Sequence, residues 1–445
     1  MVVILHQLGQ IREDLVDDLD RPTIERHCRA IGYRWRDGLL DPFNTVHLFI
    51  LQVLHRNTAM THLPHLSGER FSASAYCQAR QRLPLELFRR LTDSFCRAAG
   101  RRGSEPSWCG RRVFAMDGSG FSMPDTPALQ AAFGQPSGQR AGCGFPVAHL
   151  LALMDVDTGL LSDAILAPLN THDLKQAADL HPALRAGDVL VADRAFCSYA
   201  HIALCLQAGL HVVFRIHQRQ IVDFHPHRSC AQDVLGQGLP TSRWVRRLGP
   251  CDQIVDWVKP DSPPKWMTRE QFARLPETIR LREVKIRITD PGSRVREVVL
   301  VSTLLDPAEC PAADLGRLYR QRWQMEVNLR DLKITLGLDV LKGRSVDVVN
   351  KEFQVYVLVY NLVRLTALKA ARRQRVHPTR ISFIDALRWL QPPKPSERLP
   401  ELLVNPQRPG RREPRCIKRR GKQYPLMRSP RDELRKRLRR QHDAA

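Results

Sequence analysis

The sequence lacks three features that would mark a secreted or membrane protein. Its 11 cysteines include no Cys-x-x-Cys pair and are odd in number, which argues against a disulfide framework and favours a reducing cytoplasm. The most apolar long stretch, from Phe353 to Leu368, contains Asn361 and Arg364 and is too short to span a bilayer. The first residues, MVVILHQLGQIRED, carry no basic lead and too short an apolar run for a signal peptide. We therefore expect a soluble cytoplasmic protein with no membrane partner.

Acidic residues are scarce relative to basic ones. The chain of 445 residues has 46 Asp and Glu against 69 Lys and Arg, a formal net charge of +23. This excess predicts attraction to a polyanion, and nucleic acid is the usual one. Arg outnumbers Lys by 57 to 12, which fits bidentate phosphate contacts and GC-rich coding equally well, so the ratio does not discriminate. The 43% hydrophobic content is enough for the cores of two or three domains.

The pattern of apolar residues changes several times along the chain. It first has the three- and four-residue spacing of helices, and from Val113 it consists of short runs bounded by Gly, Asp or Pro, which predict strands of an α/β sheet with mixed pairing. Asp157–Gly159 has the composition of a hairpin turn, and Asp314–Leu336 and Lys351–Arg372 predict long helices. The predicted parts are a helical N-terminal domain (1–108), the first part of an α/β core (109–216), a β-rich insertion (217–304), the last part of the core (305–375), and a C-terminal region with a basic tail (376–445).

Two aspartates stand at the ends of predicted strands. Asp117 closes the run VFAMD and Asp193 closes DVLVAD. A carboxylate at the end of a buried strand projects into the crevice beyond the sheet edge, where ligands usually bind. Two such carboxylates on neighbouring strands could share a hard cation, although either one alone could equally cap a turn or a helix.

A third acidic residue lies in the predicted helix that contains YRQRWQMEVNLRDLK. At about 100° per residue, Tyr319, Arg322, Glu326 and Lys333 fall within about 60° of one another along the edge of its apolar stripe. An exposed Arg322–Glu326 ion pair would explain two of these residues at tenths of a kcal/mol, and it gives Tyr319 and Lys333 no role.

The spacing Y-x2-R-x3-E-x6-K in Tyr319, Arg322, Glu326 and Lys333 resembles the signature of a large group of bacterial insertion-sequence transposases of the DDE type. Asp117-Gly118-Ser119 with the following MPDTPALQAAFG is similar to the family's first-Asp block. The segment VADRAFCSY around Asp193 is similar to its second-Asp block, which commonly has Gly where this chain has Ala195. The segment FSASAYCQARQRL is similar to the family's N-terminal region, so the resemblance covers roughly residues 45 to 370.

The resemblance implies a ribonuclease-H-like mixed sheet with flanking helices, the first Asp on the central strand, the second on an adjacent strand and the Glu on a later helix. It implies a transposase that binds terminal inverted repeats and catalyses cleavage and strand transfer of double-stranded DNA. Asp117, Asp193 and Glu326 would hold two Mg²⁺ ions, for which Mn²⁺ would substitute, because three carboxylates match the oxygen ligands that magnesium prefers. Tyr319, Arg322 and Lys333 would hold the DNA phosphates. A homodimer would pair the two ends in a synaptic complex, associated with the bacterial nucleoid.

Several other residues are candidates for contacts with DNA or metal. Trp257 and Trp266 are possible platforms for a flipped base, with a core role favoured for either. The region of residues 44–83 could form a DNA-reading helix pair with contacts from Gln78, Arg80 and Arg82, or simply a packed bundle. The tail after residue 405 has 15 basic and 4 acidic residues, which favours DNA contact over a merely solvated segment. Weaker candidates are a metal site at His225, His227 and Cys230, and turn or hairpin roles for Asp125, Asp155 and Asp157.

Two alternatives remain open at this point. A metal-dependent DNA nuclease would share the fold and the carboxylates without strand transfer. A catalytically inactive, sequence-specific DNA-binding descendant would keep the fold alone, although the presence of all three carboxylates and both cations argues against decay.

Overall fold

A computed structural model describes residues 19–103, 108–391 and a few positions after 400, except for 139, 141, 170, 172, 218, 221, 228–239 and 288–296. The positions described after residue 400 are 401, 404, 405, 429, 430, 433, 436, 437 and 440, so most of the basic tail lies outside the described residues. Among the described residues, no helix is both long and apolar enough to cross a membrane.

The first part of the described chain is helical. Asp20 and Asp41 begin two of its helices, because each carboxylate accepts a hydrogen bond from a backbone amide of the first turn and a proline follows within the first two helical positions. Every residue of α4 is buried, so this helix is the centre of the helical part. The elements are α3 (Arg21–Ala30), α4 (Pro42–Leu54), η1 (Met60–His62), α5 (Leu63–Ser67), α6 (Ala73–Arg82) and α7 (Leu85–Gly103).

Five strands form the centre of the molecule. β1 (Val113–Ser122) pairs with β2 (Val147–Asp155) antiparallel on one side and with β4 (Val189–Ala192) parallel on the other. β3 (Leu161–Pro168) and β5 (His211–Arg215) extend the two sides, which gives the order β3-β2-β1-β4-β5 with β1 in the middle. The predicted mixed α/β fold, with the first aspartate on the central strand and the second beside it, is confirmed.

The turn between β2 and β3 lies where the sequence predicts it. Asp155 accepts hydrogen bonds from both the backbone amide and the hydroxyl of Thr158, and Gly159 has a φ of +70°, which a residue with a side chain rarely adopts. The turn role predicted for Asp155 is therefore confirmed.

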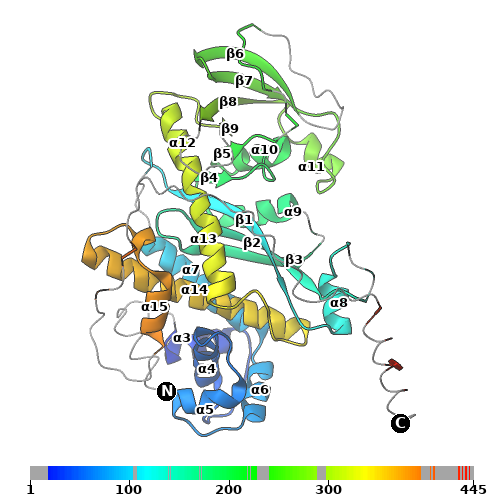
Figure 1. Cartoon of the computed structure of the whole chain (residues 1–445), viewed down its shortest axis with the longest axis vertical. Coiled ribbons are helices and arrows are strands. Elements are labelled where there is room, and N and C mark those ends of the chain that lie inside the picture. Colours follow the sequence, from blue (N-terminus) through cyan, green and yellow to red (C-terminus); the bar gives the residue numbers. More distant parts are fainter. Residues whose placement is uncertain are drawn as a thin grey trace.

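The β-rich insertion extends the same sheet. Its strands are β6 (Thr241–Gly249), β7 (Asp252–Val258), β8 (Thr278–Arg287) and β9 (Glu297–Ser302), with the short helix α11 (Arg269–Ala273) between β7 and β8. β9 pairs antiparallel with β5, so all nine strands form one sheet in the order β3-β2-β1-β4-β5-β9-β8-β7-β6. In Figure 1 the insertion strands lie at one end of the molecule and the N-terminal helices at the other.

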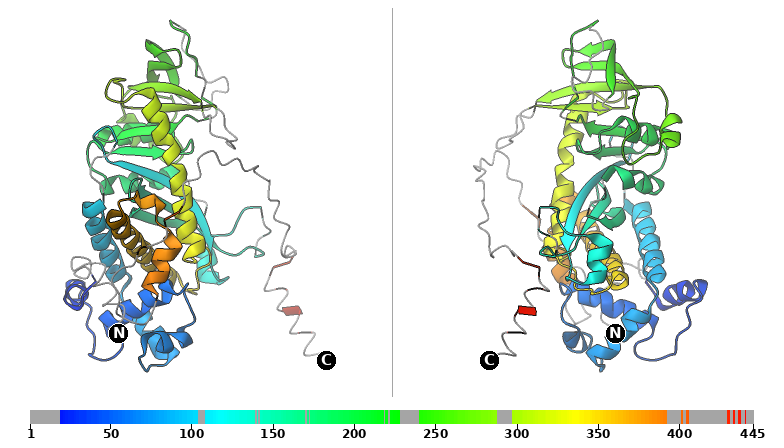
Figure 2. Two further views of the ribbon diagram at one scale, coloured as in Figure 1. Left: turned by 60° about the vertical axis from the view of Figure 1, so that its left-hand side comes forward. Right: turned by 90° about the vertical axis from the view of Figure 1, so that its right-hand side faces the viewer.

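Helices cover both faces of the central strands. Along β1, Val113 and Ala115 enter one hydrophobic core, and Phe114 and Met116 enter a second core, as expected when successive side chains of a strand point to opposite faces. The first core includes α7 and α14 (Val346–Gln374) and the second includes α9 (Asp173–Ala177), η2 (Ala178–Ala183) and α10 (Tyr199–Gln207). The views in Figure 2 show α14 beside the N-terminal helices. The remaining elements are α8 (Pro127–Phe133), η4 (Pro378–Arg380) and α15 (Phe383–Leu390).

The helix predicted for Asp314–Leu336 is divided into three segments, which corrects the prediction of one regular helix. They are α12 (Ala312–Gln321), α13 (Trp323–Arg330) and the π-helical turn η3 (Asp331–Thr335). At the junction, the Arg322 amide bonds the Tyr319 carbonyl and the Met325 amide bonds the Arg322 carbonyl, so the chain is tightened to three-residue spacing there. Even so, the segments follow one another as one rod along the sheet (Figure 1).

Candidate active site

The two predicted aspartates occupy neighbouring positions on adjacent parallel strands. The register pairs Met116 of β1 with Ala192 of β4, so Asp117 and Asp193 are the next residues along the two strands. The Asp193 carboxylate accepts a hydrogen bond from the Ala195 amide at 2.7 Å, which fixes the loop after β4. Asp193 directly follows β4, as predicted. β1, however, continues past Asp117 to Ser122 because it stays paired with β2, which corrects the prediction that Asp117 ends its strand.

The environment of Asp117 favours its protonated form. Its pKa is raised to about 6, mainly by burial and to a smaller extent by the charges of Asp193 and Glu326, while a hydrogen bond from the Gly118 amide and the Arg322 charge oppose the rise. Asp117 is thus close enough to Asp193 and Glu326 for their charges to affect its protonation.

Arg322 connects the carboxylates of the strand and the helix. Its Nη2 donates to Glu326 Oε1 at 2.8 Å, and its Nη1 lies 3.6 Å from Asp117 Oδ2. Burial opposes the charge of Arg322, but Tyr319, Glu326 and Asp117 together raise its pKa. The ion pair considered from the sequence therefore exists, and it includes Asp117, which lies 205 positions earlier in the chain.

The other two residues of the signature flank this group. Tyr319 is 9% exposed, and the Arg322 guanidinium carbon lies 5.8 Å from the centre of its ring. Lys333 Nζ donates to Ser119 Oγ of β1 at 3.0 Å, and burial lowers the pKa of the lysine. The structure thus brings all six sequence-predicted residues to β1 and its neighbours, although the helix that carries four of them is interrupted.

The donor groups fit a divalent metal of the hard, oxygen-preferring class. Asp117, Asp193 and Glu326 supply carboxylate oxygens, and a bound cation would offset both the burial of the Asp117 charge and the smaller repulsion from Asp193 and Glu326. Arg322 compensates part of that negative charge in this structure, so cation binding would loosen its contact with Asp117.

A buried network that the sequence analysis missed holds α13 and η3 in place. Arg364 of α14 bonds the Asp331 carboxylate at 3.0 Å and the Asn328 side chain at 2.6 Å. Arg364 is only 4% exposed. In the sequence it interrupts an apolar run, and a charged residue in such a run indicates that an oppositely charged or polar partner is buried beside it. Trp323, next to Arg322, is 52% exposed and was also missed as an aromatic group near the site.

One predicted DNA contact is wrong because its side chain is buried, and the core role favoured for Trp257 is confirmed. Arg80 is 6% exposed and donates to Gln52 with its guanidinium over the Phe49 ring, so it cannot contact DNA; Gln78 and Arg82 are exposed. Trp257 is 1% exposed and donates to Glu283, so it serves the core and is no base platform. Trp266 packs partly buried against the same core.

A groove beside α6 combines basic and aromatic side chains. It has a volume of about 610 Å³, and the rings of Tyr33 and Trp35 lie in it nearly parallel with centres 6.4 Å apart. The basic residues that line it are Arg34, Arg36 and Arg82, all exposed.

The weaker candidates do not form the predicted metal site among the described residues. His225 pairs with Asp223, His227 packs against the Trp244 ring, and Cys230 lies outside the described part. Asp125 accepts a hydrogen bond from Gln130, as a turn residue would.

A family match and two similar proteins relate this chain to transposases. Residues 108–362 match the family described as "Transposase DDE domain". The transposase InsG for insertion sequence element IS4 of Escherichia coli (strain K12) is 26% identical over 375 residues, 79% of this chain and 78% of that protein. The probable transposase for insertion sequence element IS5377 of Geobacillus stearothermophilus is 21% identical over 381 residues, 85% and 89% of the two chains. A piggyBac transposase, solved in a synaptic complex with hairpin DNA, is similar with a TM-score of 0.45 and 10% identity, covering 88% of this chain and 79% of that one.

Proposed function

The chain belongs to the family of transposases with a DDE domain and is an enzyme that cleaves and joins DNA, and we propose that Asp117, Asp193 and Glu326 are its three catalytic carboxylates. The observation that carries this proposal is the link through Arg322, which pairs with Asp117 of β1 and Glu326 of α13 while Asp193 stands beside Asp117. The test is cleavage of linear DNA carrying the flanking genomic inverted repeats, with wild-type protein compared to variants of the three carboxylates.

The family generally uses divalent metal ions, and we propose Mg²⁺, bound as two ions by these carboxylates, with Mn²⁺ as a substitute. Such ions supply activation of the attacking oxygen and stabilisation of the leaving oxygen in phosphodiester cleavage. The protein's own part is to hold three carboxylates on rigid elements. Asp117 lies within the buried strand β1 and Asp193 directly follows β4. Glu326 is on α13, whose Asn328 is bound by Arg364 of α14.

The cations of the site have a separate role in this proposal. Arg322 offers a planar fork for a phosphate and Lys333 a point charge beside β1, with Tyr319 packed against the guanidinium. Together they hold the phosphates of the DNA end next to the carboxylates. Because strand transfer requires both transposon ends in one complex, we also propose a homodimer in the synaptic complex on the bacterial nucleoid.

Replacing Lys333 by Met is expected to slow cleavage about 10- to 100-fold, since a hydrogen bond to a charged group contributes about 1.5–3 kcal/mol. The methionine keeps the apolar length of the side chain and removes only the charge and its donors. The measurement is single-turnover cleavage at saturating DNA. Lys285, which pairs with Glu297 in the insertion, is the matched control, and Lys285→Met should cleave at the wild-type rate. Equal rates for both variants would remove Lys333 from the site.

We propose the groove beside α6 as a surface that contacts DNA outside the active site. The guanidinium groups of the groove suit phosphates. Arg82 is exposed at the end of α6, so it remains a candidate DNA contact from the predicted helix pair. Arg34→Ala with Arg82→Ala is expected to weaken DNA binding and to reduce the slope of log affinity against log salt by about 2, because each arginine neutralises one phosphate in this proposal.

The control removes one positive charge elsewhere. Arg90→Ala breaks only an exposed ion pair with Glu86 on α7, so its salt slope should equal that of the wild type. An unchanged slope in the double variant, measured by fluorescence anisotropy over a salt series, would show that the groove makes no phosphate contacts.

A further inference from the structure

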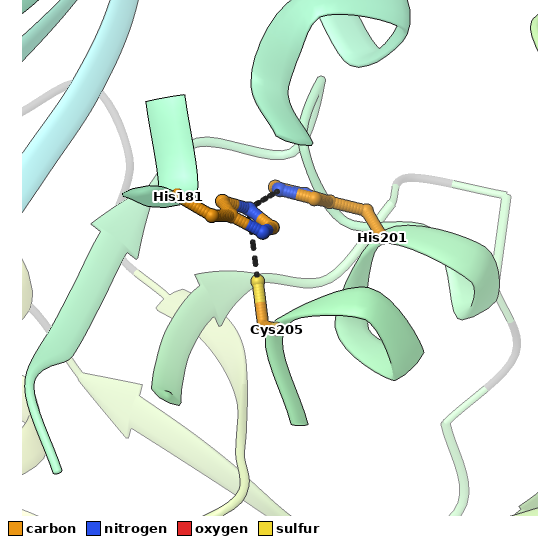
Figure 3. A group of neighbouring side chains, drawn as sticks. All are labelled: His181, His201 and Cys205. Atoms are coloured by element: carbon orange, nitrogen blue, oxygen red, sulfur yellow. Dashed lines mark hydrogen bonds between the residues drawn. The ribbon is translucent and has the colours of Figure 1, made fainter. Parts of the chain in front are cut away.

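Three metal-ligating side chains meet away from the carboxylates, on the other side of β4. His181 comes from η2, and His201 and Cys205 come from adjacent turns of α10, four residues apart and therefore on one face of the helix. Figure 3 shows the three side chains pointing toward one another. His201 and Cys205 are fully buried and His181 is 8% exposed, so the group lies in the second hydrophobic core.

The distances between the donor atoms agree with those around a tetrahedral zinc ion. His181 Nε2 lies 3.2 Å from His201 Nε2 and 3.6 Å from Cys205 Sγ. With Zn–N distances of about 2.0–2.1 Å and a Zn–S distance of about 2.3 Å, tetrahedral angles place two nitrogens roughly 3.3 Å apart and a nitrogen and a sulfur roughly 3.6 Å apart. His181 therefore stands at coordination spacing from both other ligands, and all three donor atoms lie within 4.8 Å of one another.

Hydrogen bonds among the three side chains do not fully satisfy the two Nε2 atoms and the sulfur. His201 Nδ1 donates to the Phe196 carbonyl at 2.8 Å, so in the neutral ring Nε2 carries a lone pair and no proton. If His181 Nε2 carries a proton, that proton must be shared between His201 and the sulfur. If it does not, two bare nitrogens face each other at 3.2 Å.

We propose that His181, His201 and Cys205 form a binding site for one Zn²⁺ ion. Two imidazoles and a thiolate are the ligands of zinc sites, and the fourth position would be taken by water or another small ligand. The hydrogen bond from His201 Nδ1 to the Phe196 carbonyl is the outer contact that metal-bound histidines usually make, and it aims Nε2 at the ion. This site is independent of the three catalytic carboxylates and of their proposed function.

An ion bound at this site would affect the structure around Asp193. It would join η2 to α10, and the Phe196 carbonyl that orients His201 belongs to the loop that follows Asp193. The Phe196 amide in turn bonds the Asp193 carbonyl at 3.2 Å. An ion at this site would therefore hold the loop after Asp193 in place through backbone hydrogen bonds, without binding any of the three proposed catalytic carboxylates.

The experiment is titration of metal-free full-length protein with Co²⁺, followed by optical absorption. Cobalt occupies zinc sites, and a thiolate ligand gives an intense near-ultraviolet charge-transfer band that carboxylate sites cannot give. We expect this band in the wild type, its displacement by Zn²⁺, and its loss in Cys205→Ala. Cys197→Ala, which alters another buried cysteine of the same core, should keep the band. A protein with Asp117→Asn and Glu326→Gln should also keep it, which separates this site from the carboxylates.

Absence of the band in wild-type protein would overturn the proposal, whether or not any variant folds. A band of equal intensity in Cys205→Ala would assign cobalt binding to another cysteine and would overturn it equally. The zinc content of the purified protein, measured by inductively coupled plasma mass spectrometry, should be lower in both Cys205→Ala and His181→Ala than in the wild type. Equal zinc content in the wild type and both variants would leave the three side chains as a hydrogen-bonded part of the core.

Discussion

Glu326→Gln protein is expected to bind the inverted repeats with wild-type affinity and to cut them at least about 10³-fold more slowly. A single electrostatic group in an active site typically contributes about 10²–10³-fold, and here the amide also removes one of three carboxylate ligands. The amide keeps the size of the side chain and can still accept the Arg322 hydrogen bond, so folding should be retained. The measurement is cleavage of labelled linear DNA carrying the repeats, with Mg²⁺, with Mn²⁺ and with EDTA.

The controls make the outcome specific to the site. Glu270→Gln changes a fully exposed glutamate on α11 and should cut at the wild-type rate. EDTA should stop the wild type as completely as the Glu326 substitution does. Wild-type cutting by Glu326→Gln would remove Glu326 from the catalytic set. Cutting without regard to the repeats would favour a nuclease, and binding without cutting under any metal would favour an inactive descendant.

Asp117→Asn is expected to stabilise the metal-free protein at neutral and alkaline pH while abolishing cleavage. Burial, together with Asp193 and Glu326, raises the pKa of Asp117 from 3.8 to about 6, so the folded state binds this proton more tightly than the unfolded chain does. The resulting stability is fully present below about pH 4 and is lost as the pH rises through about 6. Above that, the charged carboxylate costs about 3 kcal/mol, at about 1.4 kcal/mol per pKa unit. An uncharged asparagine avoids this cost.

The measurement is urea unfolding in EDTA over a pH series from about 4 to 8. The difference between Asp117→Asn and wild type should be near zero at the acid end and grow to about 2–3 kcal/mol at the alkaline end. Added Mg²⁺ should stabilise the wild type more than the variant, because ligand binding to the folded state shifts its stability. Asp261→Asn, at an exposed loop position, should show no such trend. A pH-independent difference at Asp117 would mean that its carboxyl is not perturbed as described.

The ionised Asp117 carboxylate lowers the stability of the metal-free protein but is needed for cleavage in this proposal, and Arg322 reduces that loss of stability. The charges of Asp193 and Glu326 disfavour the ionised form of Asp117, and a guanidinium paired with Asp117 and Glu326 reduces that repulsion. In this proposal the Arg322 guanidinium also binds a DNA phosphate, so DNA binding must be able to replace its contacts with Asp117 and Glu326. Its partial exposure, 16% of the side chain, is consistent with that requirement.

Much of the site could be predicted from local sequence patterns. The runs VFAM and VLVA form buried strand segments because their residues are apolar and β-branched or small, and each is followed directly by an aspartate, in neighbouring positions of the two strands. The spacing of Tyr319, Arg322, Glu326 and Lys333 places them on one side of a helix whatever that helix packs against. Apolar runs and helix faces are local properties that the sequence shows, whereas the end of β1 and the division of the predicted helix into three segments were decided by the tertiary structure.

What covers a face, and which distant segments meet, was decided only by the tertiary structure. Arg80 resembles a DNA contact on an isolated helix, but α4 packs over it and Gln52 binds it. The pairing of β9 with β5 makes the insertion part of the main sheet, and no periodicity within the insertion reveals its partner strand. Arg322 reaches Asp117, and His181 reaches His201 and Cys205, because the sheet brings their elements together. Periodicity in a sequence reports the side of an element that is buried; the partner on that side is set by packing among all the elements at once.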